Sequence, residues 1–155
     1  MGHVPVRIYV SGSEPDRVAV AMNRVRQIGY EVVFDWPAAR RAADAANDDS
    51  PSQTAAEIEE RLRSADVVLV LAPKAGHYFP GAFFEAGLAA GLGKSVVVAG
   101  ARARSALIAH KTAYFKYTRG ALEHLYARAH GGAALPQSLR DEWWPARPAG
   151  STPSP

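Results

Sequence analysis

The sequence predicts an α/β domain: a five-stranded parallel sheet of flavodoxin-like order 2-1-3-4-5, with helices on both faces. Two observations lead to this prediction. Strand-like apolar segments alternate along the chain with segments of helical periodicity. In addition, Asp66–Ala72 (DVVLVLA) is continuously apolar, as expected of a central strand covered on both faces. Parallel strands need crossover helices, and 2-1-3-4-5 is a common order for such sheets.

The first half of the chain is expected to form two strands and two helices. The elements are a strand over Val6–Val10, a helix to about Ile28, a strand over Tyr30–Trp36 and a helix from Ser50 to about Ser64. Gly29 ends the first helix, and Ser50 with Gln53 forms a capping box at the start of the second. Pro37–Asp49 shows no clear period and is expected to be a long loop.

The second half continues the alternation and ends in a different composition. Its elements are strand Asp66–Ala72, the helix of segment Gly81–Lys94, strand Ser95–Gly100, edge strand Thr112–Tyr117 and a helix over Gly120–Ala129. Residues 1–130 therefore form one predicted domain. Residues 131–155 are rich in Gly and Pro and are expected to be disordered, although Trp143 and Trp144 offer an alternative, docking on the body or on a neighbouring chain.

Composition excludes several classes of function. The 155 residues include no cysteine, so disulfides and thiolate metal sites are excluded. No apolar run is long enough to span a bilayer, and the N-terminus lacks a signal peptide, so we expect a soluble, cytoplasmic protein without a membrane partner. The net charge is only +3 and basic residues are not clustered with aromatics, so we expect no nucleic acid polymer as partner.

Glu85 is the first candidate for a functional residue. It is the only charged residue of segment Gly81–Lys94 before Lys94, and on a helix it shares a face with Leu88 and Ala89. That face must meet the sheet, so the carboxylate is directed inward, where an unpaired charge is costly. The plainer alternative is that Glu85, in the first turn, complements the helix dipole.

The segments that meet Glu85 follow from the fold. Ligands of such sheets bind beyond the carboxyl ends of the strands, between strands 1 and 3. The loop Ser11-Gly12-Ser13 after the first strand is a small-residue turn before a helix and is a candidate phosphate site, although as a helix start capped by Ser13 with Asp16 it needs no ligand. Tyr9, near the end of the first strand, shares a face with Ser11 by strand alternation, and it either packs in the core or serves the site.

The loop before Glu85 adds His77 and Tyr78. A histidine is the side chain most ready to titrate near neutral pH, but a lone loop histidine is more often simply solvated. No second histidine or carboxylate stands at metal-ligand spacing with it, so we predict no metal and no cofactor.

Three segments of the chain resemble the nucleoside 2-deoxyribosyltransferase family, which includes N-glycosidases of deoxynucleoside monophosphates. They are IYVSGS, SADVVLVL and AFFEAGLAAGLGKSVVV, and the third resembles the family pattern that contains the glutamate. The resemblance runs from about Val6 to the last helix, and it implies cleavage or transfer of an N-glycosidic bond.

The resemblance also implies roles for single residues. The nucleophile that attacks the anomeric carbon would be Glu85, supported by Tyr9. Ser11 or Ser13 would hold a phosphate, and Ser105 would be contributed by a neighbouring subunit, which implies a homodimer or a higher homo-oligomer. The partner implied is a nucleoside or nucleotide.

Two departures from the family pattern stand out. The position of the family's catalytic aspartate is occupied by Ile58, so its neighbour Glu57 is the candidate substitute. The acidic residue that reads the base in the transferases is replaced by Phe79, and His77 is a candidate for base contact or leaving-group protonation.

Two alternatives to an enzyme of this family remain at the level of sequence. One is a module that binds or senses a nucleotide without turnover, favoured by the loss of the aspartate. The other is an NAD-cleaving domain similar to Toll/interleukin-receptor domains, which also carry a glutamate on a helix beyond a central strand. The direction of the Glu57 side chain discriminates between enzyme and sensor.

Overall fold

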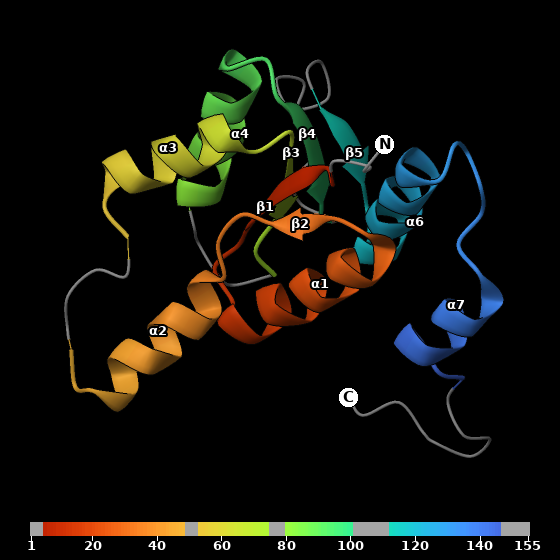
Figure 1. Cartoon of the computed structure of the whole chain (residues 1–155), viewed down its shortest axis with the longest axis horizontal. Coiled ribbons are helices and arrows are strands. Elements are labelled where there is room, and N and C mark those ends of the chain that lie inside the picture. The colour runs from red at the N-terminus through yellow and green to blue at the C-terminus, as the bar shows by residue number, and fades with distance from the viewer. Residues whose placement is uncertain (1–4, 49–52, 75–79, 101–111, 147–155) are drawn as a thin grey trace.

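A computed structural model describes residues 5–48, 53–74, 80–100 and 112–146. It confirms the predicted architecture: five parallel strands in the order β2-β1-β3-β4-β5, with helices on both sides (Figure 1). The strands are β1 (Arg7–Ser11), β2 (Glu31–Val32), β3 (Val67–Leu71), β4 (Ser95–Ala99) and β5 (Ala113–Phe115). The helices are α1 (Pro15–Ile28), α2 (Trp36–Ala45), α3 (Ala55–Ser64), α4 (Pro80–Gly91), α6 (Thr118–Ala129) and α7 (Gln137–Trp143).

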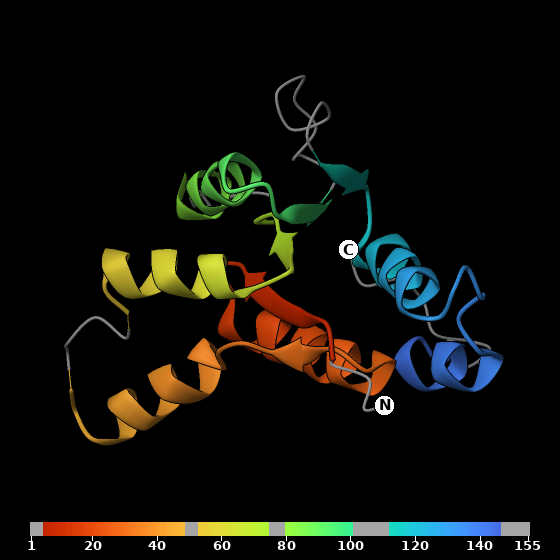
Figure 2. The same ribbon diagram turned by 45° about the horizontal axis from the view of Figure 1, so that its top comes forward.

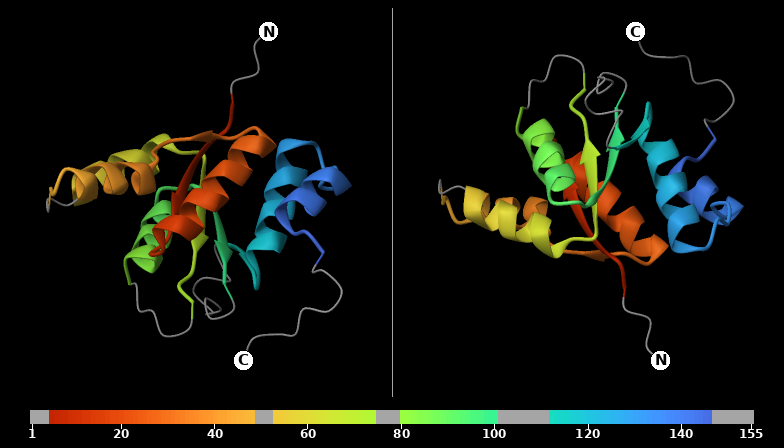
Figure 3. Two further views of the ribbon diagram at one scale, coloured as in Figure 1. Left: turned by 90° about the horizontal axis from the view of Figure 1, so that it is seen from below. Right: turned by 90° about the horizontal axis from the view of Figure 1, so that it is seen from above.

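The sheet separates two apolar layers. Helices α1 and α6 lie on one face and α3 and α4 on the other, as the rotated views in Figures 2 and 3 show. Because successive side chains of a strand point to opposite faces, β1 contributes to both layers. Ile8 and Val10 belong to the core cluster under α1 and α6, whereas Tyr9 belongs to the cluster under α3 and α4.

Helix α1 forms as its sequence predicts. Pro15 occupies its first turn, and an apolar stripe of five residues is buried against the sheet. The helix ends at Gly29, whose φ of 109° lies in the left-handed region that favours glycine. The amide of Gly29 bonds the carbonyl oxygens of Val25 and Arg26, so the last turn is closed before β2 begins.

The expected loop over Pro37–Asp49 was wrong for most of its length, because α2 spans Trp36–Ala45. Asp35 caps this helix, and its side chain accepts a hydrogen bond from the amide of Ala38 at 3.1 Å. The segment is rich in alanine and arginine, which have high helix propensity, so it forms a helix although only Trp36 and Pro37 in its first turn are buried. The early start of α2 also shortens β2 to Glu31–Val32, well inside the expected strand Tyr30–Trp36.

The start of α3 also differs from the expectation. The helix begins at Ala55, and its capping box is formed by Thr54 and Glu57 rather than by Ser50 and Gln53. The Thr54 side chain accepts from the Glu57 amide at 3.2 Å, and the Glu57 carboxylate accepts from the Thr54 amide at 2.6 Å. Both candidate pairs have the spacing of a capping box, and the threonine pair carries the negative charge that suits a helix N-terminus. Ser50 lies outside the described residues.

The C-terminal segment is not disordered throughout, as was expected from residue 131 onward. Residues 137–143 form α7, and Trp143 is only 6% exposed. Its indole Nε1 donates to Gln27 Oε1 at 2.6 Å, and its carbonyl oxygen accepts from Arg24 at 2.8 Å. This contact with α1 matches the predicted alternative, in which the tryptophans dock on the body of the domain. Burial of the large aromatic ring of Trp143 offsets the entropic cost of ordering a short helix.

No helix in the described parts of the chain is long and apolar enough to cross a membrane.

Candidate active site

Glu85 is held inside the protein by helix α4. Its side chain lies on the face of α4 that also buries Ala82, Ala86 and Ala89, and it is only 9% exposed. Because α4 begins at Pro80, Glu85 stands in the second turn, and the first turn contains no acidic residue. A role in complementing the helix dipole is therefore not supported, since that effect is confined to the first turn.

The Glu85 carboxyl group has few partners in the described structure. Its Oε2 atom is buried and accepts no hydrogen bond from a described residue. Burial raises the pKa of Glu85, and the nearby Ser11 hydroxyl, which lowers it, only partly offsets this effect. The Ser11 oxygen is itself buried and completes no well-formed hydrogen bond among the described residues. Two neighbouring polar groups that are buried without hydrogen-bond partners are candidates for binding a ligand.

Tyr9 and Ser11 approach Glu85 from the same face of β1. They alternate with Ile8 and Val10, as the sequence predicts, and Ser11 is the last residue of the strand. Tyr9 is 1% exposed, and burial, followed by the negative charge of Glu85, raises the pKa of its hydroxyl. The phenol therefore stays protonated at neutral pH and is available as a hydrogen-bond donor beside the carboxylate.

A second charged group, which the sequence analysis missed, also acts on Tyr9. Arg61 of α3 donates from its Nη1 to Gln53 Oε1 at 2.6 Å, and its guanidinium carbon stands 3.4 Å from the centre of the Phe34 ring. The positive charge of Arg61 and a hydrogen bond from the Gln53 side chain both act to lower the pKa of Tyr9, against the larger effect of burial. The sequence offered one signal, since Arg61 lies at helical spacing from Ile58 and Ala65 on the inward stripe of α3.

Glu57 is not brought to the carboxyl group of Glu85 by any described contact. Its carboxylate is used in the capping box of α3, and one oxygen lies 3.9 Å from the Arg61 guanidinium. The hydrogen bonds from the backbone and the side chain of Thr54 lower the pKa of Glu57, so it is ionised at neutral pH. An ionised carboxylate held in a helix cap is a poor proton donor. The Glu57 side chain is turned to its own helix cap, which favours the sensor alternative.

The loop after β1 is tightly packed rather than open. A Cβ at Gly12 would lie 2.7 Å from a methyl carbon of Val18, so only glycine fits between the strand end and α1. Ser13 Oγ is buried and without a hydrogen-bond partner among the described residues. The residue that caps α1 is Glu14 and not Ser13, and it makes no side-chain capping bond.

Three predicted site residues, His77, Tyr78 and Ser105, lie outside the described residues, so their roles stay predictions. Within the described ranges, no group of three or more His, Cys, Asp or Glu side chains could hold a metal ion.

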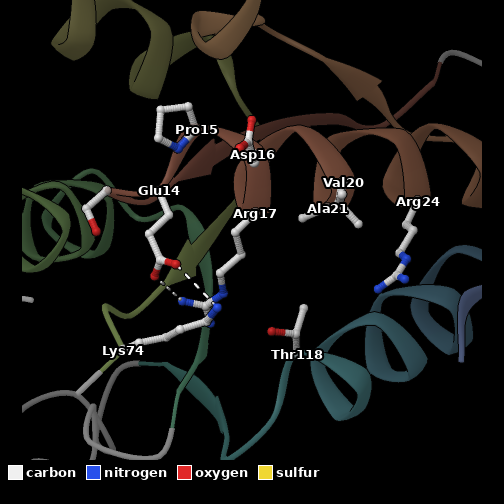
Figure 4. Close-up of a pocket in the computed structure, with 10 residues that line it drawn as sticks. Glu14, Pro15, Asp16, Arg17, Val20, Ala21, Arg24, Lys74 and Thr118 are labelled. Carbon is white, nitrogen blue, oxygen red and sulfur yellow. Dashed lines mark hydrogen bonds and ion pairs between the residues drawn. The ribbon is translucent and has the colours of Figure 1, made fainter. Parts of the chain in front are cut away.

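A pocket of about 740 Å³ opens between α1, α6 and the residues after β3, and Glu85 does not line it (Figure 4). Its wall includes Ser13, Thr118 and the basic side chains of Arg17, Arg24 and Lys74. The basic groups are already engaged: Arg17 donates to the carbonyl of Ala72 at 2.6 Å, Lys74 lies 3.4 Å from Glu14, and Arg24 bonds the carbonyl of Trp143. With carboxylates also in the wall, the pocket is poorly suited to an anion.

The fold and the buried acid define a doubly wound α/β domain with a glutamate at the carboxyl ends of its strands. No family model matches the chain, and no curated protein matches its sequence. Among solved structures, the chain is similar to the CMP N-glycosidase BcmB of Clostridium botulinum. The TM-score is 0.50 and the sequence identity 17%, over 77% of this chain and 97% of that chain. At this identity the likeness establishes the fold and not the chemistry.

Proposed function

We propose that the protein cleaves the N-glycosidic bond of a nucleoside or nucleoside monophosphate, by hydrolysis or transfer, with Glu85 as nucleophile. The observation that carries the proposal is the buried Glu85 carboxyl group with Tyr9 and Ser11 beside it at the end of β1. The resemblance of the glutamate segment to the deoxyribosyltransferase family, and the structural likeness to a CMP N-glycosidase, support the same chemistry.

In the proposed reaction, a carboxylate oxygen of Glu85 forms a bond to the anomeric carbon of the sugar. The bond from that carbon to the base nitrogen breaks, and the base leaves with the electron pair and takes up a proton. Water, or a second base in a transfer reaction, then attacks the anomeric carbon and frees Glu85. A dry site favours the attack, because a poorly solvated carboxylate loses little hydration on reaching the sugar.

Tyr9 and Ser11 have complementary parts in this scheme. The protonated Tyr9 hydroxyl donates toward the charge of Glu85 and orients the carboxylate, and Ser11 acts on the same group. The proton for the leaving base is proposed to come from His77 or from solvent, since Glu57 is held in its helix cap. Ser13 and Gly12 are proposed to line the sugar-phosphate side, and a homo-oligomer that adds Ser105 remains part of the proposal.

A second candidate function is a module that binds a nucleotide without turnover. The use of Glu57 as a helix cap favours it, because Glu57 is the candidate substitute for the family's catalytic aspartate and its carboxylate is already engaged.

The experiment is an incubation of the pure protein with nucleosides, their monophosphates and NAD, with released base measured by chromatography. The native protein is expected to release base from one class, and Glu85→Gln to lose more than roughly a thousandfold of the rate. Glu60→Gln, an exposed change on α3, is the matched control and should match the native protein. Turnover of NAD alone would favour the NAD-cleaving alternative. Binding without release by the native protein would favour the sensor.

A further inference from the structure

Arg61 holds an unusual place for a charged side chain next to an apolar core. It lies on α3 with only 19% of its side chain exposed, and its contacts come from segments far apart in the sequence. Phe34, after β2, covers one face of the guanidinium, and Gln53, before α3, accepts a hydrogen bond at its edge. The Glu57 carboxylate, 3.9 Å away, is half exposed and already used by Thr54. Such a planar cation, stacked and hydrogen-bonded at once, has little freedom to move.

The Arg61 contacts lead to the Glu85 site through one amide. Gln53 Oε1 accepts from Arg61, so only the Nε2 group of this side chain is left to donate, and the Gln53 side chain is among the groups that lower the pKa of the Tyr9 hydroxyl. The positive charge of Arg61 also acts on Tyr9, whose other charged neighbour is Glu85. Tyr9 packs in the same buried cluster as Leu62, the neighbour of Arg61 on α3, and as Ala82 and Ala86 of α4, the helix that carries Glu85.

We propose that Arg61 is a positioning residue of the Glu85 site: stacked on Phe34, it fixes Gln53 and thereby holds the Tyr9 hydroxyl facing the carboxyl group. Without Arg61, the Gln53 amide loses the partner that sets its direction, and the Tyr9 hydroxyl loses a fixed donor. If the Tyr9 hydroxyl has no fixed orientation, the Glu85 carboxylate spends less time in the geometry needed for attack. The affinity for substrate changes little. The functional half of this inference rests on the proposed function; the link from Arg61 through Gln53 to Tyr9 does not.

The first test measures the coupling between Arg61 and Tyr9 and needs no activity. Urea unfolding is measured for the native protein, Tyr9→Phe, Arg61→Gln and the double variant. If Arg61 acts on the Tyr9 hydroxyl, the unfolding equilibrium constant of the double variant departs roughly threefold or more from the product of the single effects. The same cycle with Arg63→Gln should be additive, because Arg63, on the same helix, is exposed and pairs with Glu59 at 2.7 Å. Additive behaviour of Tyr9 and Arg61 would overturn the proposal.

The second test separates positioning from a purely structural effect. With the substrate that the native protein cleaves, Arg61→Gln should lower kcat roughly 10- to 100-fold and leave KM within about threefold. Arg61→Lys should restore little of the native kcat, because an ammonium group lacks the planar guanidinium that stacks on Phe34 while it donates to Gln53. Added guanidinium ion should partly restore kcat in Arg61→Ala, and Arg63→Gln should keep native kcat. Native kcat in Arg61→Gln would overturn the proposal.

The two tests distinguish the failure of each idea. If the native protein releases no base but Tyr9 and Arg61 are coupled, the proposed function fails and the positioning of Tyr9 stands. If base release depends on Glu85 but Tyr9 and Arg61 are uncoupled, the proposed function stands and the role of Arg61 is wrong.

Discussion

Replacement of Glu85 by methionine should make the protein more stable at neutral pH. Methionine has a similar length but no polar atoms, so it removes the buried Oε2, which lacks a hydrogen-bond partner among the described residues. A buried unsatisfied polar group costs on the order of 1–3 kcal/mol, so we expect a gain of about 2 kcal/mol in the free energy of unfolding. For a chain of this length, that gain raises the melting temperature by roughly 4–8 °C.

The gain should depend on pH with a definite sign. The pKa of Glu85 is raised in the folded protein, so the folded state holds this proton more tightly than the unfolded chain does. The stabilising contribution of the protonated group is fully present below the ordinary carboxyl pKa, and it is lost as the pH rises through the folded value. Glu85→Met should therefore gain more over the native protein at about pH 7.5 than at about pH 4. Tyr9 stays protonated across this range and does not contribute.

The assay is urea unfolding of both proteins at the two pH values, with Glu60→Gln as the control for an exposed carboxylate. The control should show no pH-dependent difference from the native protein. The reasoning would be refuted by a variant that is less stable than the native protein at neutral pH, or by a gain that is equal at both pH values.

Three further predictions concern the supports of the fold. Trp143→Ala should lower the free energy of unfolding by about 3 kcal/mol, since it removes a buried indole and its hydrogen bond to Gln27. Urea unfolding measures this loss, and a loss below about 0.5 kcal/mol would mean that α7 does not dock on α1. Gly12→Ala should cost about 1–3 kcal/mol because its Cβ would lie 2.7 Å from a methyl carbon of Val18, and native thermal stability of this variant would contradict that packing. Thr54→Ala should cost about 1 kcal/mol through loss of the α3 cap, whereas Ser50→Ala should leave the melting temperature unchanged if Thr54 is the true cap.

The sheet and the burial of Glu85 could be predicted from the sequence because both follow from local periodicity. Alternation along β1 placed Tyr9 and Ser11 on one face, and helical spacing on α4 directed Glu85 toward the sheet. These patterns need only the residues of one element and the requirement that apolar faces meet.

Other features depend on contacts that no single element reveals. Helix α2 forms because Asp35 caps it and Trp36 is anchored, with the indole donating to the Val10 carbonyl at 3.1 Å, although only Trp36 and Pro37 of this helix are buried. Arg61 was missed because its partners, Phe34 and Gln53, come from loops whose positions only the tertiary structure sets. The sequence did show that Arg61 is a charged residue on the inward, otherwise apolar stripe of α3. A charged residue at such a position is therefore a candidate for a site residue.

The central claim is that Glu85 forms a covalent bond with the anomeric carbon, and the stereochemistry of the product tests it most directly. The cleavage reaction is run in aqueous methanol, and the configuration of the methyl glycoside is read by proton NMR before it can equilibrate. Attack by Glu85 followed by attack of methanol inverts the carbon twice, so the account predicts the configuration of the substrate. A product of inverted configuration would show a single displacement by solvent and would contradict the account.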